Sequence, residues 1–184
     1  MALNHNEVRK HGLDETDRLR DELNVLVSIA VLVDGDVLHI VHSAPANWPR
    51  WHTTVGRRAV AHCTSLGKVL LAYRPWDEVV AIIEAYGWRP YTRLSIQEFP
   101  RLQEELTAIR ERGFAIDREE RNLGTVCIGA PIYNFSGTVV AALSISGIVE
   151  SLTQETWEER ASRVREAANR ISYRLGYQQS PAYL

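Results

Sequence analysis

Two neighbouring segments in the second half of the chain alternate between apolar residues and small or polar ones. They run from Val126 to Tyr133 and from Thr138 to Ser146, and turn-forming residues 134–137 join them. A period of two is typical of β-strands, and the short Gly-containing connection predicts a hairpin. One face of each predicted strand is apolar. The other face is small and partly polar, and it includes Cys127, Gly129, Ala142, Ser144 and Ser146.

The small face of this hairpin has two interpretations. If the register brings the two small sets together, the sheet carries a shallow hollow lined by two hydroxyls and a thiol, which is how a small-molecule site begins. The same pattern also suits a sheet face on which a helix packs closely. The strands alone leave both open.

Apolar periodicity predicts most other elements. A strand hairpin is expected at residues 25–33 and 37–42, and a short strand follows Gly113. Residues 1–12 show no clear period, which predicts an irregular start before a short polar helix from Asp14 or Thr16 to Leu23. Four further helices are expected at residues 65–73, 76–86, 100–112 and 153–175. Meandering strands with helices grouped between them indicate an α+β fold with a largely antiparallel sheet.

The helix predicted after Thr64 offers a possible anion site. Its first backbone N–H groups, at Ser65, Leu66 and Gly67, lack partners within the helix and lie at the positive end of its dipole. A helix start of this kind is also often simply solvated by water. Thr64 or Ser65 is the expected N-cap.

Composition narrows the class of protein. The 184 residues are 45% hydrophobic and 24% charged, which predicts one globular domain with a sizeable core. A net charge of −2 argues against a large nucleic-acid surface. The two cysteines show neither zinc spacing nor a disulfide framework, and no signal peptide or membrane-length apolar run is present. We therefore expect a cytoplasmic protein with no metal and no cofactor.

Three motifs in order resemble the effector-binding domain of the IclR (isocitrate lyase regulator) family of bacterial transcription factors. The first is GRR…HCTSLGK, residues 56–68. The second is IRERGFAIDREE…LG…CIGAP, residues 109–131. The third is AALSISG, residues 141–147. The resemblance covers roughly Leu19 to Gly176. It departs from the family at Val60-Ala61, where the family often has proline before the leucine and histidine, and at Ser65 and Leu66, where the family's residues are often smaller.

The resemblance implies a GAF-like domain, in which a curved antiparallel sheet is flanked by helices and the last helix is long. It implies a linker remnant at residues 1–22, the effector-binding domain at 23–178 and a tail at 179–184. A small organic acid or an aromatic carboxylate is the expected effector. The matching pocket positions are Ser65, Leu66, Asp117, Cys127, Ser144 and Ser146.

The same resemblance implies self-association as a dimer or tetramer. It also implies DNA binding only through a winged helix-turn-helix, which this sequence does not contain. The chain is then either an effector half or a stand-alone sensor. Asp117 also has a simpler interpretation, as a turn residue paired with Arg118 or Arg121.

Two other classes of function compete with a sensor. An acyl-transfer enzyme would use Cys127 as nucleophile with His62 or His42 as base, but a thiol in an apolar strand is expected to be inert. We therefore expect no enzyme activity. A purely structural dimerisation domain would fill the pocket with its own side chains, for which Leu66 and the loop carrying Trp48 and Trp51 are candidates.

Overall fold

The computed structural model describes residues 2–46, 48 and 55–178. Within them, six strands form one curled antiparallel sheet with the order β3-β2-β1-β6-β5-β4. The strands are β1 (Leu26–Val33), β2 (Asp36–Ser43), β3 (Arg58–Val60), β4 (Ala115–Arg118), β5 (Thr125–Tyr133) and β6 (Val139–Ile148). The helices are α1 (Ala2–Leu23), α2 (Ser65–Ala72), α3 (Trp76–Tyr86), α4 (Phe99–Arg112) and α5 (Trp157–Arg174), with a 3-10 turn, η2, at Gln154–Thr156. The predicted α+β class is confirmed.

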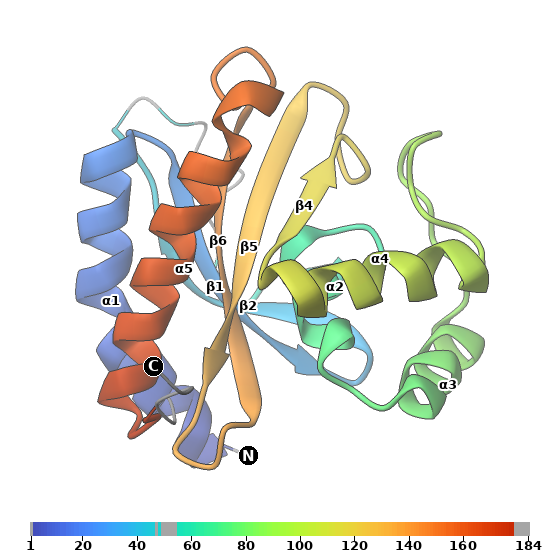
Figure 1. Ribbon diagram of the computed structural model, residues 1–184, viewed down its shortest axis with the longest axis horizontal. Coiled ribbons are helices and arrows are strands. Elements are labelled where there is room, and N and C mark those ends of the chain that lie inside the picture. Colours follow the sequence, from blue (N-terminus) through green and yellow to red (C-terminus); the bar gives the residue numbers. More distant parts are fainter. Residues whose placement is uncertain (1, 47, 49–54, 179–184) are drawn as a thin grey trace.

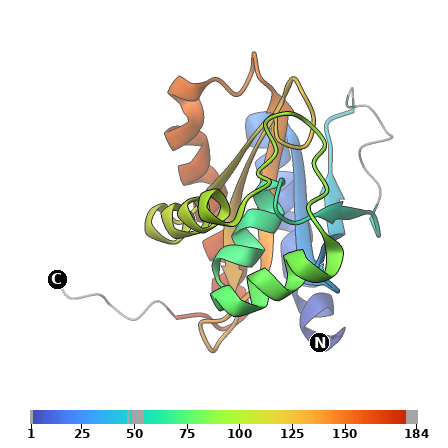
Figure 2. The same ribbon diagram turned by 90° about the vertical axis from the view of Figure 1, so that its right-hand side faces the viewer.

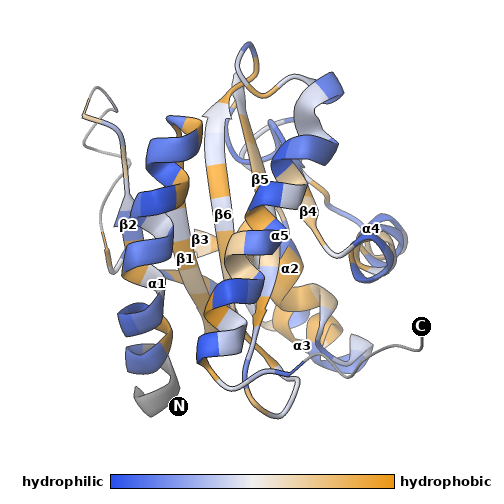
Figure 3. Cartoon of the chain, turned by 60° about the vertical axis from the view of Figure 1, so that its left-hand side comes forward, coloured by the Kyte–Doolittle hydropathy of each residue, from blue (hydrophilic) through white to orange (hydrophobic). Residues whose placement is uncertain are grey.

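Helices cover both faces of the sheet. Helices α1 and α5 lie side by side on one face (Figure 1), and α2, α3 and α4 lie over the other (Figure 2). The apolar faces of β5 and β6 pack under α1 and α5, and Ile128, Leu143 and Ile145 are fully buried there. Figure 3 shows that α1 and α5 carry their hydrophilic residues on the outer side. The period-two pattern therefore places one core layer on each side of the sheet.

The hairpin register brings the two small faces together. Cys127 lies opposite Ser146, and Gly129 lies opposite Ser144. A Cβ atom on Gly129 would stand 3.2 Å from the backbone carbonyl of Ser65, at the start of α2. Both interpretations of this face are therefore correct. Part of it allows a helix to approach closely, and the part beside it forms a hollow.

The predicted helix ends are mostly confirmed. Helix α4 ends at Gly113, which adopts the left-handed conformation at φ 79°, and its core stripe is fully buried. Helix α3 ends at Gly87 as expected. At residues 153–156 a 3-10 turn replaces the expected start of the last helix, which begins at Trp157. Strand β3, only three residues long, was not predicted.

The N-terminal prediction was wrong, because α1 begins at Ala2 rather than near Asp14. Val8 is buried, and a Cβ atom on Gly12 would stand 2.4 Å from Cδ1 of Ile29, so Gly12 lets α1 approach the sheet closely. Glu15 is 3% exposed and accepts hydrogen bonds from two arginines of α5, Arg170 and Arg174. Tertiary packing, rather than its weak apolar period, holds this helix.

Candidate functional site

A cavity of about 110 Å³ lies between the sheet and the start of α2. The six residues that the sequence nominated all line it, although they come from four separate elements, α2, β4, β5 and β6. Those residues are Ser65, Leu66, Asp117, Cys127, Ser144 and Ser146. Leu66 and Trp48 also line the cavity without filling it, whereas Trp51 lies outside the described residues.

Strand pairing explains how distant residues meet in the cavity. One cross-strand row runs through Asp117, Cys127, Ser146 and Leu26 on β4, β5, β6 and β1. The neighbouring row runs through Gly129, Ser144, Ser28 and His42. Residues two apart along a strand share a face, so both rows point to the same side of the sheet. Within the first row, Ser146 Oγ donates a hydrogen bond to Cys127 Sγ at 3.1 Å.

The start of α2 forms the opposite wall of the cavity. Thr64 is the N-cap, as one of the two predicted choices: its Oγ1 accepts from the Gly67 N–H at 3.1 Å and donates to the Val60 carbonyl at 2.9 Å. Gly67 is required by packing, because a Cβ atom there would stand 2.2 Å from the Ala61 carbonyl oxygen. The chain therefore folds tightly back on itself just before the helix, and Ser65 and Leu66 are held against the sheet.

Sequence reasoning missed His39 and His42 as cavity residues. They are three apart on β2, which in a regular strand would place them on opposite faces. A bulge shifts the register of β1 with β2, so that Ala30 pairs with His39 and Ser28 with His42. The two rings stack with centroids 4.7 Å apart, and His42 Nδ1 lies 2.8 Å from Ser28 Oγ. A local break in alternation, at His39-Ile-Val-His42, was the available signal.

The cavity holds His39 in its uncharged form. Burial is the main cause that lowers the pKa of His39 to about 3, and the nearby His42, Arg57 and Arg121 add to it. Arg57 and Arg121 line the same cavity. At neutral pH the two arginines therefore supply positive charge to the wall, and His39 does not.

Three buried polar atoms at the cavity wall have no hydrogen-bond partner among the described residues. They are His39 Nδ1, Trp48 Nε1 and Ser65 Oγ. Buried polar atoms in native proteins almost always have a partner, because an unsatisfied group costs about 1–3 kcal/mol. A polar molecule held in this cavity would supply partners for them.

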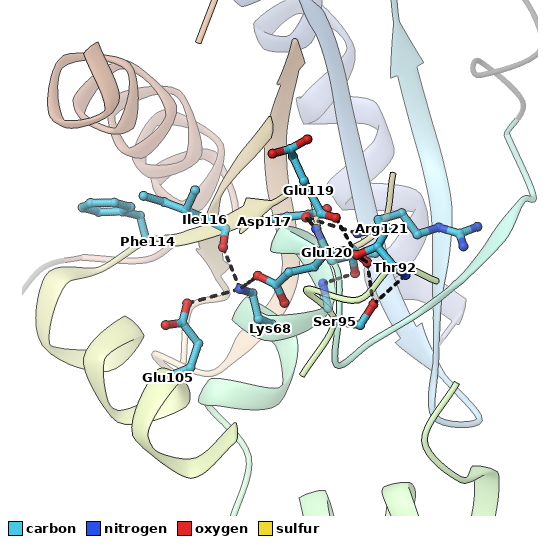
Figure 4. Close-up of polar contacts among 12 residues, drawn as sticks. Lys68, Thr92, Ser95, Glu105, Phe114, Ile116, Asp117, Glu119, Glu120 and Arg121 are labelled. Atoms are coloured by element: carbon cyan, nitrogen blue, oxygen red, sulfur yellow. Dashed lines mark hydrogen bonds and ion pairs between the residues drawn. The ribbon is translucent and has the colours of Figure 1, made fainter. Parts of the chain in front are cut away.

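Asp117 is a buried carboxyl at the base of the loop between β4 and β5. Its Oδ1 accepts from the backbone N–H of Glu120 at 2.8 Å and of Arg121 at 3.3 Å (Figure 4). Burial first, and then the charge of Glu120, raise the pKa of Asp117 to about 7. The side chain is thus a turn residue as well as a cavity residue. The alternative pairing with Arg118 or Arg121 is not formed, because their guanidinium groups stack over Trp157 and Tyr91.

A buried lysine supports this loop from behind. Lys68 of α2 is 1% exposed, and its Nζ lies 2.5 Å from Glu120 Oε1, 3.2 Å from Glu105 Oε1 and 2.6 Å from the Ile116 carbonyl oxygen. Figure 4 shows these contacts converging on Nζ from α4, β4 and the loop after β4. Lys68 falls within the motif at residues 56–68, but no role for it was predicted from the sequence. It joins the helix that starts at the cavity to the loop that carries Asp117.

Cys127 and His62 do not form a catalytic pair. Burial raises the pKa of the Cys127 thiol far above its usual value, so the thiolate that a nucleophile requires is disfavoured. His62 does not line the cavity; its Nε2 accepts from the Arg89 N–H at 3.1 Å, and burial lowers its pKa to about 4. His62 is a structural residue that holds the segment after α3.

The described residues contain no metal-binding cluster and no helix that could span a membrane. No three of their His, Cys, Asp or Glu side chains gather closely enough to hold a metal ion. None of the helices in that part of the chain combines the length and apolarity that crossing a membrane requires.

A family model and a curated relative both match most of this chain. The family model for the bacterial transcriptional regulator IclR C-terminal domain matches residues 1–173. The HTH-type transcriptional regulator KdgR of Escherichia coli K12 is 33% identical over 150 residues, which cover 81% of this chain and 57% of KdgR. The chain thus spans little more than half the length of that relative.

Solved structures agree with the family match. The C-terminal domain of E. coli KdgR superposes with a TM-score of 0.83 and 28% identity, over 93% of this chain and 99% of that one. The inducer-binding domain of the PobR transcription factor from Acinetobacter, a double mutant in complex with 3-hydroxybenzoic acid, gives a TM-score of 0.82 and 26% identity, over 89% of this chain and 96% of that one. These proteins are transcriptional regulators rather than enzymes.

Proposed function

Because this chain belongs to the IclR family of bacterial transcriptional regulators and corresponds to their C-terminal domain, we propose that its cavity binds a small organic acid as effector. The observation that carries the proposal is the set of three unpartnered polar atoms on residues that line one cavity, namely His39, Trp48 and Ser65. Trp48 Nε1 can only donate, and the Ser65 hydroxyl can donate too. A ligand rich in hydrogen-bond acceptors would satisfy these two donors.

Charge and volume narrow the ligand class. Arg57 and Arg121 favour an anion, and the N–H groups at the start of α2 add to that preference. Asp117 opposes it only when ionised. A cavity of about 150 Å³ holds benzene, so the 110 Å³ here favours short-chain acids over aromatic carboxylates.

The test is thermal unfolding of the chain against keto acids, hydroxy acids and aromatic carboxylates. A ligand present at about 100 times its dissociation constant stabilises by about 2.7 kcal/mol, which for a chain of this size raises Tm by roughly 5–11 °C. Pyruvate, lactate and glycolate should give a saturable rise, and benzoate a smaller one or none. An unchanged Tm with every acid in the panel would refute the proposal.

Variants place the binding site. The rise should disappear in a Ser146→Ala/Asp117→Ala double variant, whose changes lie in the cavity. It should persist in Asp77→Ala, which alters an exposed carboxylate in the first turn of α3. A rise that survives the double variant would place the acid elsewhere.

Regulation by the whole protein is a further part of the proposal. We propose that effector binding alters DNA binding by a winged helix-turn-helix domain, that the domain self-associates as a dimer or tetramer, and that the protein works in the cytoplasm. A ligand shifts such an equilibrium only if it binds the two states with different affinity. Light scattering of this chain tests self-association. Fluorescence anisotropy of operator DNA with the full regulator, with and without the acid, tests the coupling.

A further inference from the structure

We propose that a carboxylate ligand enters this cavity together with one proton, shared between the ligand and Asp117, so that binding weakens as the pH rises above neutrality. This inference rests on the proposed function, because it concerns how the same cavity accepts an acid. It makes the site sensitive to pH, because the affinity for the effector then depends on the pH around the protein.

A bound acid and Asp117 share one small cavity. Asp117 is 2% exposed and lines this cavity of about 110 Å³. Both hydrogen bonds that Asp117 accepts within the described residues go to Oδ1, from Glu120 N and Arg121 N. Oδ2 is therefore the oxygen available to a ligand. Two carboxylates in one small site hold a proton between them.

No cation among the described residues forms an ion pair with Asp117 that would relieve this repulsion. Asp117 takes part in none of the ion pairs within the described part of the chain. The buried Lys68 already pairs with Glu120 and Glu105. Arg121 lies over the Tyr91 ring, 3.3 Å from its centroid, and Figure 4 shows its side chain extending away from Asp117. The loop thus supplies hydrogen bonds to Asp117 without supplying a counter-charge.

Other titratable groups face Asp117 and set its proton affinity. Glu120 and the burial of the site favour the protonated form, and Lys68 opposes it less strongly. The thiols of Cys63 and Cys127 stay neutral, because burial raises their pKa. The remaining charged or titratable groups that line the cavity are Arg57 and Arg121 and the histidines His39 and His42. Because burial holds the pKa of Asp117 at about 7, the proton is available near physiological pH.

Proton linkage fixes the size of the effect. If the acid binds only to the protonated form of Asp117, the dissociation constant follows the protonated fraction. With a midpoint near 7 that fraction falls about tenfold between pH 6 and pH 8. Asp117 is not the only titratable residue that lines the cavity, so a pH effect by itself does not identify the group responsible, and a variant is required.

The experiment is calorimetric titration of lactate, pyruvate and glycolate at pH 6.0 and 8.0, with wild type, Asp117→Asn and the surface control Asp77→Asn. Asparagine keeps the acceptor oxygen for Glu120 and Arg121 N–H and cannot ionise. Wild type and the control should bind about tenfold more weakly at pH 8.0. Asp117→Asn should bind almost equally at both pH values.

Each other outcome overturns the proposal, in a way that separates it from the proposed function. Binding by wild type with the same affinity at both pH values would refute proton uptake and leave effector binding intact. A pH effect that persists in Asp117→Asn would assign the proton to another group and refute the role of Asp117. Strong loss of binding in Asp117→Asn at both pH values would show an ionised Asp117 that accepts from a ligand hydroxyl. Absence of binding by any of the three acids at either pH would refute both proposals.

Discussion

Replacement of Lys68 by methionine should destabilise the domain strongly. Methionine has a similar length and volume, so packing in α2 is largely kept, and the change removes a charge that is 1% exposed. Two carboxylates lose an ion-pair partner: Glu120, which is 7% exposed, and Glu105, which is 23% exposed. The Ile116 carbonyl loses its donor as well.

The expected loss follows from the uncompensated buried charge. Removal of one partner of a buried ion pair costs about 3–5 kcal/mol, far more than the 0–1 kcal/mol of an exposed pair. Glu105 is partly exposed and also pairs with Arg112 at 2.9 Å. Most of the loss in stability therefore comes from the unpaired charge of Glu120. We therefore expect Lys68→Met to lower the free energy of unfolding by about 3–4 kcal/mol, and Tm by roughly 6–16 °C.

Equilibrium unfolding in urea measures this loss, with a double-variant cycle as control. Glu120→Gln in the Lys68→Met background removes the unpaired charge and should recover about half of the lost stability or more. Arg74→Met breaks the exposed pair with Glu78 and should cost less than about 1 kcal/mol. A Lys68→Met loss no larger than that of Arg74→Met would refute the argument that the buried cluster holds the loop.

Three further perturbations test the packing and the electrostatics. Gly67→Ala should cost about 1–3 kcal/mol in urea unfolding, because its Cβ would meet the Ala61 backbone at 2.2 Å; an unchanged midpoint would contradict the close approach. Glu15→Gln weakens two hydrogen bonds from α5, so amide hydrogen exchange should accelerate in α1 and not in α4; equal protection would show that α1 docks by apolar contacts alone. Asp117, with a pKa of about 7 when folded and 3.8 ordinarily, favours folding at low pH and loses that contribution as the pH rises through 7. Between pH 5 and pH 8, the free energy of unfolding of Asp117→Asn should therefore rise relative to that of wild type by on the order of 2 kcal/mol. A difference between the two proteins that stays constant with pH would refute the raised pKa.

Much of the fold was predictable because local signals agreed with the tertiary structure. The hairpin of β5 and β6 followed from strict alternation, and the end of α4 followed from Gly113. The start of α1 was not predictable, because its stability comes from contacts with α5 that a sequence window does not contain. Gly12 in particular lies within this helix, where its lack of a side chain lets the helix fit against Ile29.

The candidate site divided in a similar way. Residues on regular strands, such as Ser144 and Ser146, could be assigned to one face by counting. His39 and His42 could not, because the bulge on β2 changes the count between them. The role of Lys68 was also hidden, since its partners lie 37 and 52 residues away in the chain. Long-range polar contacts leave no periodic trace in a sequence.

The most direct test of the proposed effector site is amide chemical-shift mapping during titration with lactate, pyruvate or glycolate. The account predicts saturable shifts concentrated at Ser65 and Leu66, at Asp117 to Arg121, and at Ser144 and Ser146, which surround one cavity. Shifts centred instead on Asn169 to Tyr177, where α5 borders a second hollow, would contradict it and move the effector to the opposite face of the sheet.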